Sequence, residues 1–139
     1  MILTALLLSV PAAPPPLDCK SPDTQAAMNA CSHRAFESAD ADLNVVWNDV
    51  RAIAKREDAS MHDEDDQPGY WDTLLKAQRA WLTYRDAHCR FASYDARGGS
   101  LQPTLINDCM ADLTKARTQQ LRGLLVNQVS GEPKTVSES

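Results

Sequence analysis

Two cysteines stand at equal distances on either side of a glycine turn, and this symmetry restricts how the second half of the chain can fold. Cys89 lies nine residues before Gly98, and Cys109 lies nine residues after Ser100. The sequence Gly98-Gly99-Ser100 predicts a tight turn, with Ser100 as a candidate N-cap of the following helix. A helical hairpin that folds at this turn brings both sulfur atoms to the same level. We therefore predict a disulfide between Cys89 and Cys109.

The other two of the four cysteines, Cys19 and Cys31, are predicted to form a second disulfide. Cys19 precedes the first expected helix, and Cys31 lies about two turns inside it, where a returning N-terminal segment can bridge the two. Free buried thiols are the alternative. Zinc is disfavoured because the cysteines lack the CxxC spacing. Two disulfides in a chain of 139 residues are typical of proteins that fold in an oxidising compartment.

The first residues have the pattern of an export signal. An apolar run from Ile2 to Val10 is too short to span a bilayer, and small residues and three prolines follow it. We interpret residues 1–16 as a signal peptide, with an ordinary first helix as the alternative. The residues before Cys19 do not include the small residue that a lipoprotein cleavage site requires. We expect a periplasmic or secreted protein that is neither lipid-anchored nor membrane-spanning.

Helical spacing marks three segments of the chain. In the first segment, apolar side chains recur at gaps of three and four, at Phe36, Ala39, Leu43, Val46, Val50 and Ile53. The second segment has a stripe of period 3.6 that consists of Trp71, Leu74, Leu75, Gln78, Trp81, Leu82, Arg85 and Cys89. The third is marked by Ile106, Cys109, Met110, Leu113, Leu121 and Leu124. We predict helices over about 23–56 and 69–95 and a third after the glycine turn. The predicted fold class is all-α, a small antiparallel helical bundle of about three helices braced by two disulfides. This domain covers residues 17–127, and a disordered tail covers 128–139.

Four polar residues lie in or beside these apolar stripes. Asp40 and Asn44 share one face of the first predicted helix, and Gln78 and Arg85 lie within the stripe of the second. A buried arginine needs a carboxylate, and Asp40 comes level with Arg85 if the two helices are antiparallel. We predict a buried ion pair between them that fixes helix register; a ligand site is the alternative.

The three tryptophans have a structural and a functional interpretation. Trp47, Trp71 and Trp81 lie on or next to the packing stripes, which favours a role in the core. An aromatic binding patch is the alternative.

Acidic residues are concentrated between the first two predicted helices. Six of the 19 acidic residues lie within ten positions: Glu57, Asp58, Asp63, Glu64, Asp65 and Asp66. Such a run can be a solvated loop, attract a cationic protein or hold calcium weakly, and the full calcium-loop spacing is absent. The candidate contacts for a cationic partner are Asp63, Glu64, Asp65 and Asp66. The net charge of −5 disfavours nucleic acid as a partner.

Catalytic and metal-binding patterns are absent from the sequence. It contains no nucleophile elbow, P-loop or zinc-protease helix, and its three histidines are far apart. His33 and His88 are a possible pair of metal ligands without an evident third ligand, so exposed helix histidines are the favoured interpretation. We predict no enzymatic activity, no cofactor and no metal.

Several motifs together resemble the lysozyme inhibitor LprI-like domain family of exported bacterial proteins. The residues that carry the resemblance over about 19–125 are Asp40, Leu43, Asn44, Trp47, Gln78, Trp81, Arg85, Asp86, Cys89, Gly98, Gly99, Ser100, Cys109, Thr114 and Arg117. At Trp47 the sequence departs from the tyrosine expected for the family. The resemblance implies an exported helical domain, and in some members inhibition of lysozyme.

The sequence therefore leaves two functions open. The first is an exported binding protein of lysozyme-inhibitor type, which binds a cationic envelope-active enzyme such as lysozyme. The alternative is a periplasmic structural or assembly protein of the envelope without inhibitory activity. The motif residues are interpreted as structural and not as an inhibitory site.

Overall fold

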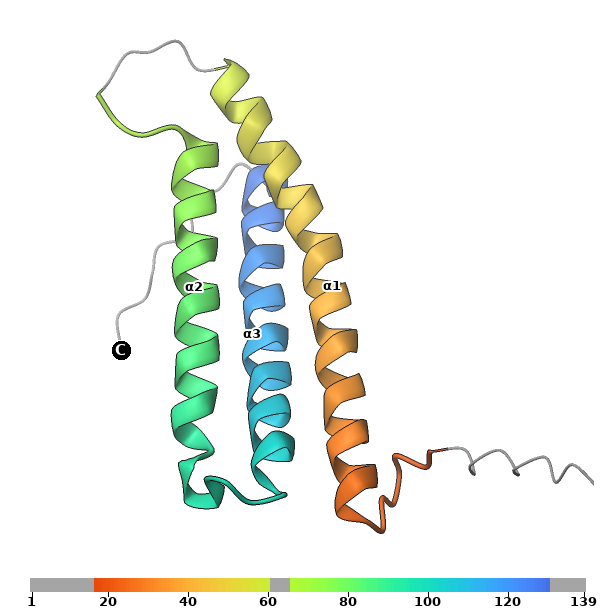
Figure 1. Cartoon of the computed structure of the whole chain (residues 1–139). Helices are drawn as coiled ribbons and strands as arrows, with labels where there is room; N and C mark the ends of the chain where they lie inside the picture. Colours follow the sequence, from red (N-terminus) through yellow and green to blue (C-terminus); the bar gives the residue numbers. More distant parts are fainter. Residues whose placement is uncertain (1–16, 61–65, 131–139) are drawn as a thin grey trace, which may run out of the picture.

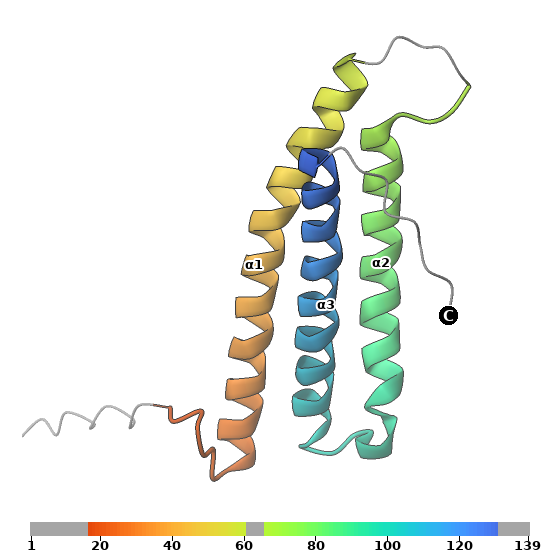
Figure 2. The same ribbon diagram turned by 180° about the vertical axis from the view of Figure 1, so that it is seen from behind.

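The protein is a bundle of three long helices. The computed structural model describes residues 17–60 and 66–130. The elements are α1 (Gln25–Ser60), α2 (Tyr70–Ala92), the 3-10 turn η1 (Tyr94–Ala96) and α3 (Gln102–Ser130). Helices α1 and α3 run in one direction and α2 in the other, and α3 lies between α1 and α2 in both views (Figures 1 and 2). The predicted all-α class is confirmed.

The helix ends differ from those predicted. Helix α1 begins at Gln25, where the backbone N–H of Ala27 donates to the Thr24 hydroxyl, and it continues past residue 56 to Ser60. Helix α2 ends at Ala92 and not at 95, because Ser93 turns the chain and donates from its hydroxyl to the Arg90 carbonyl. Helix α3 continues to Ser130, beyond the expected boundary at 127.

The turn before α3 corrects the predicted cap. Helix α3 begins at Gln102, so Leu101 and not Ser100 is its flanking residue. The turn is longer than the glycine pair alone, because η1 precedes it and Gly98 adopts a positive φ of 77°. The Gln102 side chain then reaches back and accepts from the Gly98 N–H at 2.9 Å. Positive φ favours glycine, which explains Gly98 at this point.

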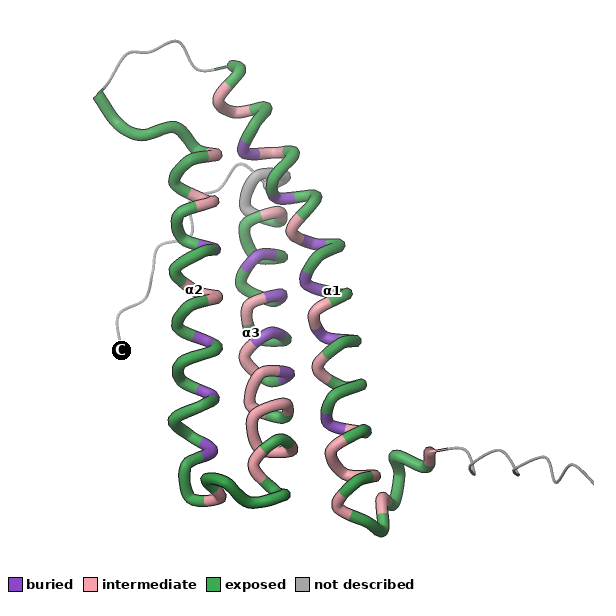
Figure 3. Tube along the Cα trace, in the orientation of Figure 1, coloured by how far each residue is buried: buried purple, intermediate pink, exposed green. Residues whose placement is uncertain are grey.

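The core is a seam between α1 and α3. Its buried centre consists of Leu43, Val46, Val50 and Leu121, with Trp47, Leu74, Trp81 and Leu125 packed around it. Small side chains, among them Ala39, Ala54, Ala111, Thr114 and Thr118, are also buried along the two helices. Figure 3 shows buried positions along most of α1 and in the middle part of α3. Small residues at a helix contact shorten the distance between axes, so this pair packs closely.

Both predicted disulfides are confirmed. Cys89–Cys109 joins the end of α2 to α3, and Cys19–Cys31 joins the segment before α1 to α1 itself. Each closes a short loop, which in the chain-entropy model stabilises a protein by about 3 kcal/mol. Both crosslinks lie toward the same end of the bundle, at which α1 begins and α2 ends.

Several predictions fall on residues that the structure does not describe. They are the signal peptide at 1–16, the acidic residues Asp63, Glu64 and Asp65, and the tail from 131 to 139. Among the described residues, no helix combines the length and the hydropathy that crossing a membrane requires.

Candidate functional site

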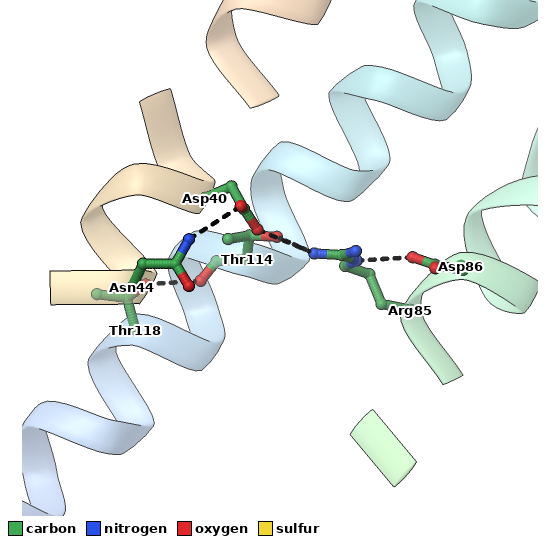
Figure 4. Close-up of polar contacts among 6 residues, drawn as sticks. All are labelled: Asp40, Asn44, Arg85, Asp86, Thr114 and Thr118. Carbon is green, nitrogen blue, oxygen red and sulfur yellow. Dashed lines mark hydrogen bonds and ion pairs between the residues drawn. The ribbon is translucent and has the colours of Figure 1, made fainter. Parts of the chain in front are cut away.

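Arg85 is the centre of a polar network that joins all three helices (Figure 4). Only 6% of the residue is exposed. Its guanidinium lies 3.5 Å from an Asp40 oxygen on α1 and donates at 3.3 Å to the Thr114 hydroxyl on α3. The predicted burial and the Asp40 pair are therefore confirmed. The closest carboxylate, however, is that of the adjacent Asp86, at 2.9 Å.

Aromatic rings complete the surroundings of this guanidinium. The carbon of the Arg85 guanidinium lies 5.1 Å from the Phe36 ring and 5.2 Å from the Trp81 ring. Rings at this distance attract a cation through their quadrupoles, and more strongly when water is excluded. Asn44 holds the pair from the other side, since its amide donates to Asp40 at 3.1 Å. The guanidinium is thus paired with carboxylates of α1 and α2 and hydrogen-bonded to a hydroxyl of α3.

A second cation lies on Trp81. Arg117 of α3 has its guanidinium 5.9 Å from the Trp81 ring and donates to the side-chain oxygen of the buried Gln78 at 3.0 Å. A further bond reaches Gln120 at 3.1 Å. Burial lowers the pKa of Arg117 from its usual value, because the neutral surroundings solvate the cation less well than water does. The motif residues Gln78, Trp81 and Arg117 therefore join α2 to α3.

The contacts of the Arg85 network hold the three helices together. Within residues 17–60 and 66–130, no buried side-chain nitrogen or oxygen lacks a hydrogen-bond partner. The printed bonds of Arg85 run to side chains of all three helices, to Asp40 on α1, Asp86 on α2 and Thr114 on α3. The arrangement supports the predicted role in helix register.

Sequence reasoning missed a polar cluster at the disulfide end. Gln25 donates from its side chain to Asn29 at 2.9 Å and to Thr104 at 3.1 Å, and the Thr104 hydroxyl donates to Asn29. Asn29 also donates to the carbonyl of Ser100 at 3.2 Å. The cluster ties the start of α1 to the start of α3. The only available signal was a set of polar residues in the first turns of two helices.

Asp58 holds the start of α2 and was also missed. The N-cap residue Gly69 has no side chain, and the Asp58 carboxylate of α1 accepts instead from the backbone N–H groups of Tyr70 at 2.6 Å and Trp71 at 2.9 Å. A Cβ at Gly69 would lie 2.9 Å from the Asp58 carboxylate, so a larger residue at this position would displace the capping carboxylate. One member of the acidic run is thus a capping residue, which contributes about 1 kcal/mol at a helix N-terminus.

The other candidate residues lie apart from these contacts. Trp47 packs against the core, and its ring centroid lies 5.9 Å from that of Trp71, which agrees with a packing role. His33 is exposed beside Glu37 at 3.3 Å, and the exposed His88 stacks on Tyr84. In the part of the chain that the structure describes, no three His, Cys, Asp or Glu side chains are grouped to hold a metal ion.

Comparison with known proteins identifies the family. The family model described as lysozyme inhibitor LprI matches residues 18–121. The chain belongs to the lysozyme inhibitor LprI family. The matched segment contains both disulfides and every residue of the Arg85 network. In this LprI-family protein the motif residues Asp40, Gln78, Arg85, Thr114 and Arg117 take part in contacts that join the helices.

A relative of this LprI-family protein is known from a bacterium. An uncharacterized protein of Rhizobium meliloti (strain 1021) is 39% identical over 112 residues, which cover 80% of this chain and 81% of the relative. No solved structure matches the chain. The comparisons therefore establish the family and not the partner.

Proposed function

We propose that the protein is an exported inhibitor-type binding protein whose partner is a cationic envelope-active enzyme such as lysozyme. Membership of the lysozyme inhibitor LprI family over residues 18–121 carries this proposal. The two disulfides support export to the periplasm or the outside of the cell, because such crosslinks persist in oxidising compartments. The net charge of −5 is complementary to a cationic partner.

The mode of action that we propose is binding and not catalysis. The buried polar residues are engaged in joining helices, as the Arg85 network is, and this leaves the surface as the place of contact. An inhibitor of this kind needs to cover or distort the active site of its partner. The affinity then depends on a few well-packed contacts and on charge complementarity.

The proposed activity is tested by titrating the purified, oxidised protein into a bacterial cell-wall lysis assay with lysozyme. We expect lysis to fall to a plateau as the protein saturates the enzyme. The control is the same protein reduced and alkylated, in which both crosslinks are lost. Full lysis at saturating protein, together with no binding at low salt, would refute the lysozyme proposal and favour the envelope-structural alternative.

For the contact with the partner, we propose the acidic segment Asp63, Glu64, Asp65 and Asp66. The segment concentrates the negative charge of the chain, and it connects α1 to α2 at the end opposite the disulfides. Neutralising the four residues to Asn and Gln should slow association with lysozyme and reduce its salt dependence, because long-range charges act mainly on the association rate.

A matched variant separates local charge from total charge. Neutralising four exposed carboxylates elsewhere changes the net charge equally; we choose Asp42, Asp49, Asp95 and Asp112. This control should keep most of the wild-type association rate. Equal rates for the two variants would refute the acidic segment as the contact and leave the binding activity itself intact.

A further inference from the structure

An apolar groove lies at the end of the bundle opposite the disulfides. Its volume is about 340 Å³, and it is lined by Val50, Ile53, Ala54, Glu57, Tyr70, Leu74, Leu124 and Leu125. All three helices contribute: α1 supplies one wall, the first turns of α2 another and the last turns of α3 a third. Leu124 is 46% exposed and Tyr70 is 45% exposed, so large apolar surface is open to solvent here. Concave apolar surface of this kind is typical of binding sites.

Two acidic residues, Glu57 and Asp58, lie near the C-terminal end of α1, which forms one wall of the groove. Glu57 is the charged residue of its lining, and its carboxylate lies 3.9 Å from the exposed Arg56, which is too far for a strong hydrogen bond. Glu57 opens the run of six acidic residues that ends at Asp66. The next residue of this run, Asp58, accepts from the backbone N–H of Tyr70, which lines the groove. The basic Lys55 is engaged above the Trp71 ring, at 5.0 Å.

We propose that this groove receives one apolar side chain of a cationic protein, with lysine or arginine residues on both sides of that side chain. The apolar walls provide the burial, and the carboxylates of Glu57 and Asp58 attract the flanking cations. A buried apolar anchor within a charged rim is the usual arrangement of a strong contact between proteins. The inference rests on the proposed function and names the surface that performs it.

The experiment measures binding of lysozyme to the full chain and to two variants. Leu124→Asp places a carboxylate in the groove, and Val45→Asp makes the same change at a 65% exposed site of α1 outside the groove lining. Added negative charge alone would strengthen attraction to a cationic partner. We expect Leu124→Asp to lower the affinity by about tenfold or more, as loss of a central anchor contact does, and Val45→Asp to leave it equal to or slightly above that of the wild type.

A second probe tests the groove without lysozyme. It is a short peptide with one leucine between two pairs of lysines, compared with the same peptide carrying serine in place of leucine. The leucine peptide should bind more tightly to the wild type, and Leu124→Asp should abolish the difference. Tyr70→Ser, on another wall of the groove, is a second variant in case the first fails a thermal-melting control.

The outcomes separate the two proposals. Lysozyme binding that is equal in wild type, Leu124→Asp and Tyr70→Ser would overturn the groove and leave the inhibitor function intact. Groove-dependent binding of the leucine peptide without lysozyme binding would support the groove and refute lysozyme as the partner. No preference of the wild type for the leucine peptide would overturn the groove. Two further results would also overturn the proposal, because each would make the chain itself the occupant of the groove. One is tighter peptide binding after removal of residues 131–139. The other is a dimer that Leu124→Asp dissociates.

Discussion

The seam between α1 and α3 and the attachment of α2 use different chemistry. The buried positions of α1 are Ser32, Ala39, Leu43, Val46, Val50 and Ala54, so five of the six are apolar. Those of α2 are Gln78, Arg85 and Cys89, which are an amide, a cation and a crosslinked sulfur. The seam depends on close packing of apolar side chains. Helix α2 depends on directional polar contacts, a disulfide and the Asp58 cap.

The difference shows how stability and register are divided between the two regions. Apolar burial is favourable but has little directional preference, so the seam tolerates small shifts along the helix axes. The Arg85 network requires Asp40, Thr114 and Trp81 at fixed positions. A buried ion pair contributes little net stability but can exclude other alignments, because a shift of α2 would separate Arg85 from Asp40 on α1 and from Thr114 on α3. We infer that the seam provides most of the folding free energy and that the network sets the position of α2.

The largest expected effect lies in the seam. Leu121 is 0% exposed at the centre of the core. Leu121→Ala removes buried methyl groups and leaves a cavity, and we expect the free energy of unfolding to fall by about 4 kcal/mol. Urea unfolding followed by circular dichroism measures this. The control is Leu124→Ala on the same helix, at a half-exposed site. A loss at Leu121 no larger than that at Leu124 would contradict the seam as the main source of stability.

The next effect concerns the network. Arg85→Ala removes the pairs with Asp40 and Asp86 and the ring contacts, and it should lower the free energy of unfolding by about 3 kcal/mol, the lower end for a broken buried pair. Both carboxylates are partly exposed and regain water, which limits the cost. Arg79→Ala, at an exposed position of α2, should change stability by less than about 0.5 kcal/mol. Equal urea midpoints for Arg85→Ala and Arg79→Ala would contradict the claim that the Arg85 network holds α2 in place.

A smaller effect is expected at the start of α2. Asp58→Ala leaves the N–H groups of Tyr70 and Trp71 without their acceptor, and we expect a loss of about 1 kcal/mol. Asp66→Ala changes the net charge equally at an exposed position and should have little effect. Thermal melting of both variants measures the difference. If the two melt alike, the Asp58 cap contributes nothing to the attachment of α2.

The smallest expected effect is at Asp108 on α3. Desolvation and then the negative charge of Asp112 raise the pKa of Asp108, while Lys115 lowers it, so the ionised form is disfavoured in the folded state. Asp108→Asn should therefore raise the free energy of unfolding at pH 7, by about 0.3 kcal/mol for a like-charge pair on an exposed helix surface. The gain should vanish as the pH falls below the ordinary carboxyl value of 3.8. A gain that persists at pH 3 would point to a cause other than charge.

The sequence predicted contacts whose residues occupy recognisable positions in a helical repeat or about a turn. A cation within an apolar stripe identified Arg85 as buried, and the antiparallel arrangement identified Asp40 as its partner. Symmetry about the glycine turn identified the Cys89–Cys109 disulfide. These signals are local or depend only on helix geometry, so they could be found without coordinates.

The missed contacts depend on packing between segments that no periodicity relates. In the sequence, Asp58 is one of six clustered acidic residues, and nothing distinguishes it from the others. It caps α2 because the end of α1 packs next to the start of α2. Asp86 follows Arg85 directly in the sequence, and adjacent residues of a helix do not normally face each other, so their spacing did not predict this pair. The cluster of Gln25, Asn29 and Thr104 joins positions up to 79 residues apart. The groove likewise depends on three helix ends meeting.

The central claim, that an inhibitor-type protein binds a cationic enzyme, is tested most directly by association kinetics. Immobilised lysozyme is exposed to the oxidised wild-type protein at low and at physiological ionic strength. We predict saturable binding with an association rate that falls as salt rises, because the attraction between the acidic chain and the cationic enzyme is screened. Absence of binding at low ionic strength, where that attraction is greatest, would contradict the claim.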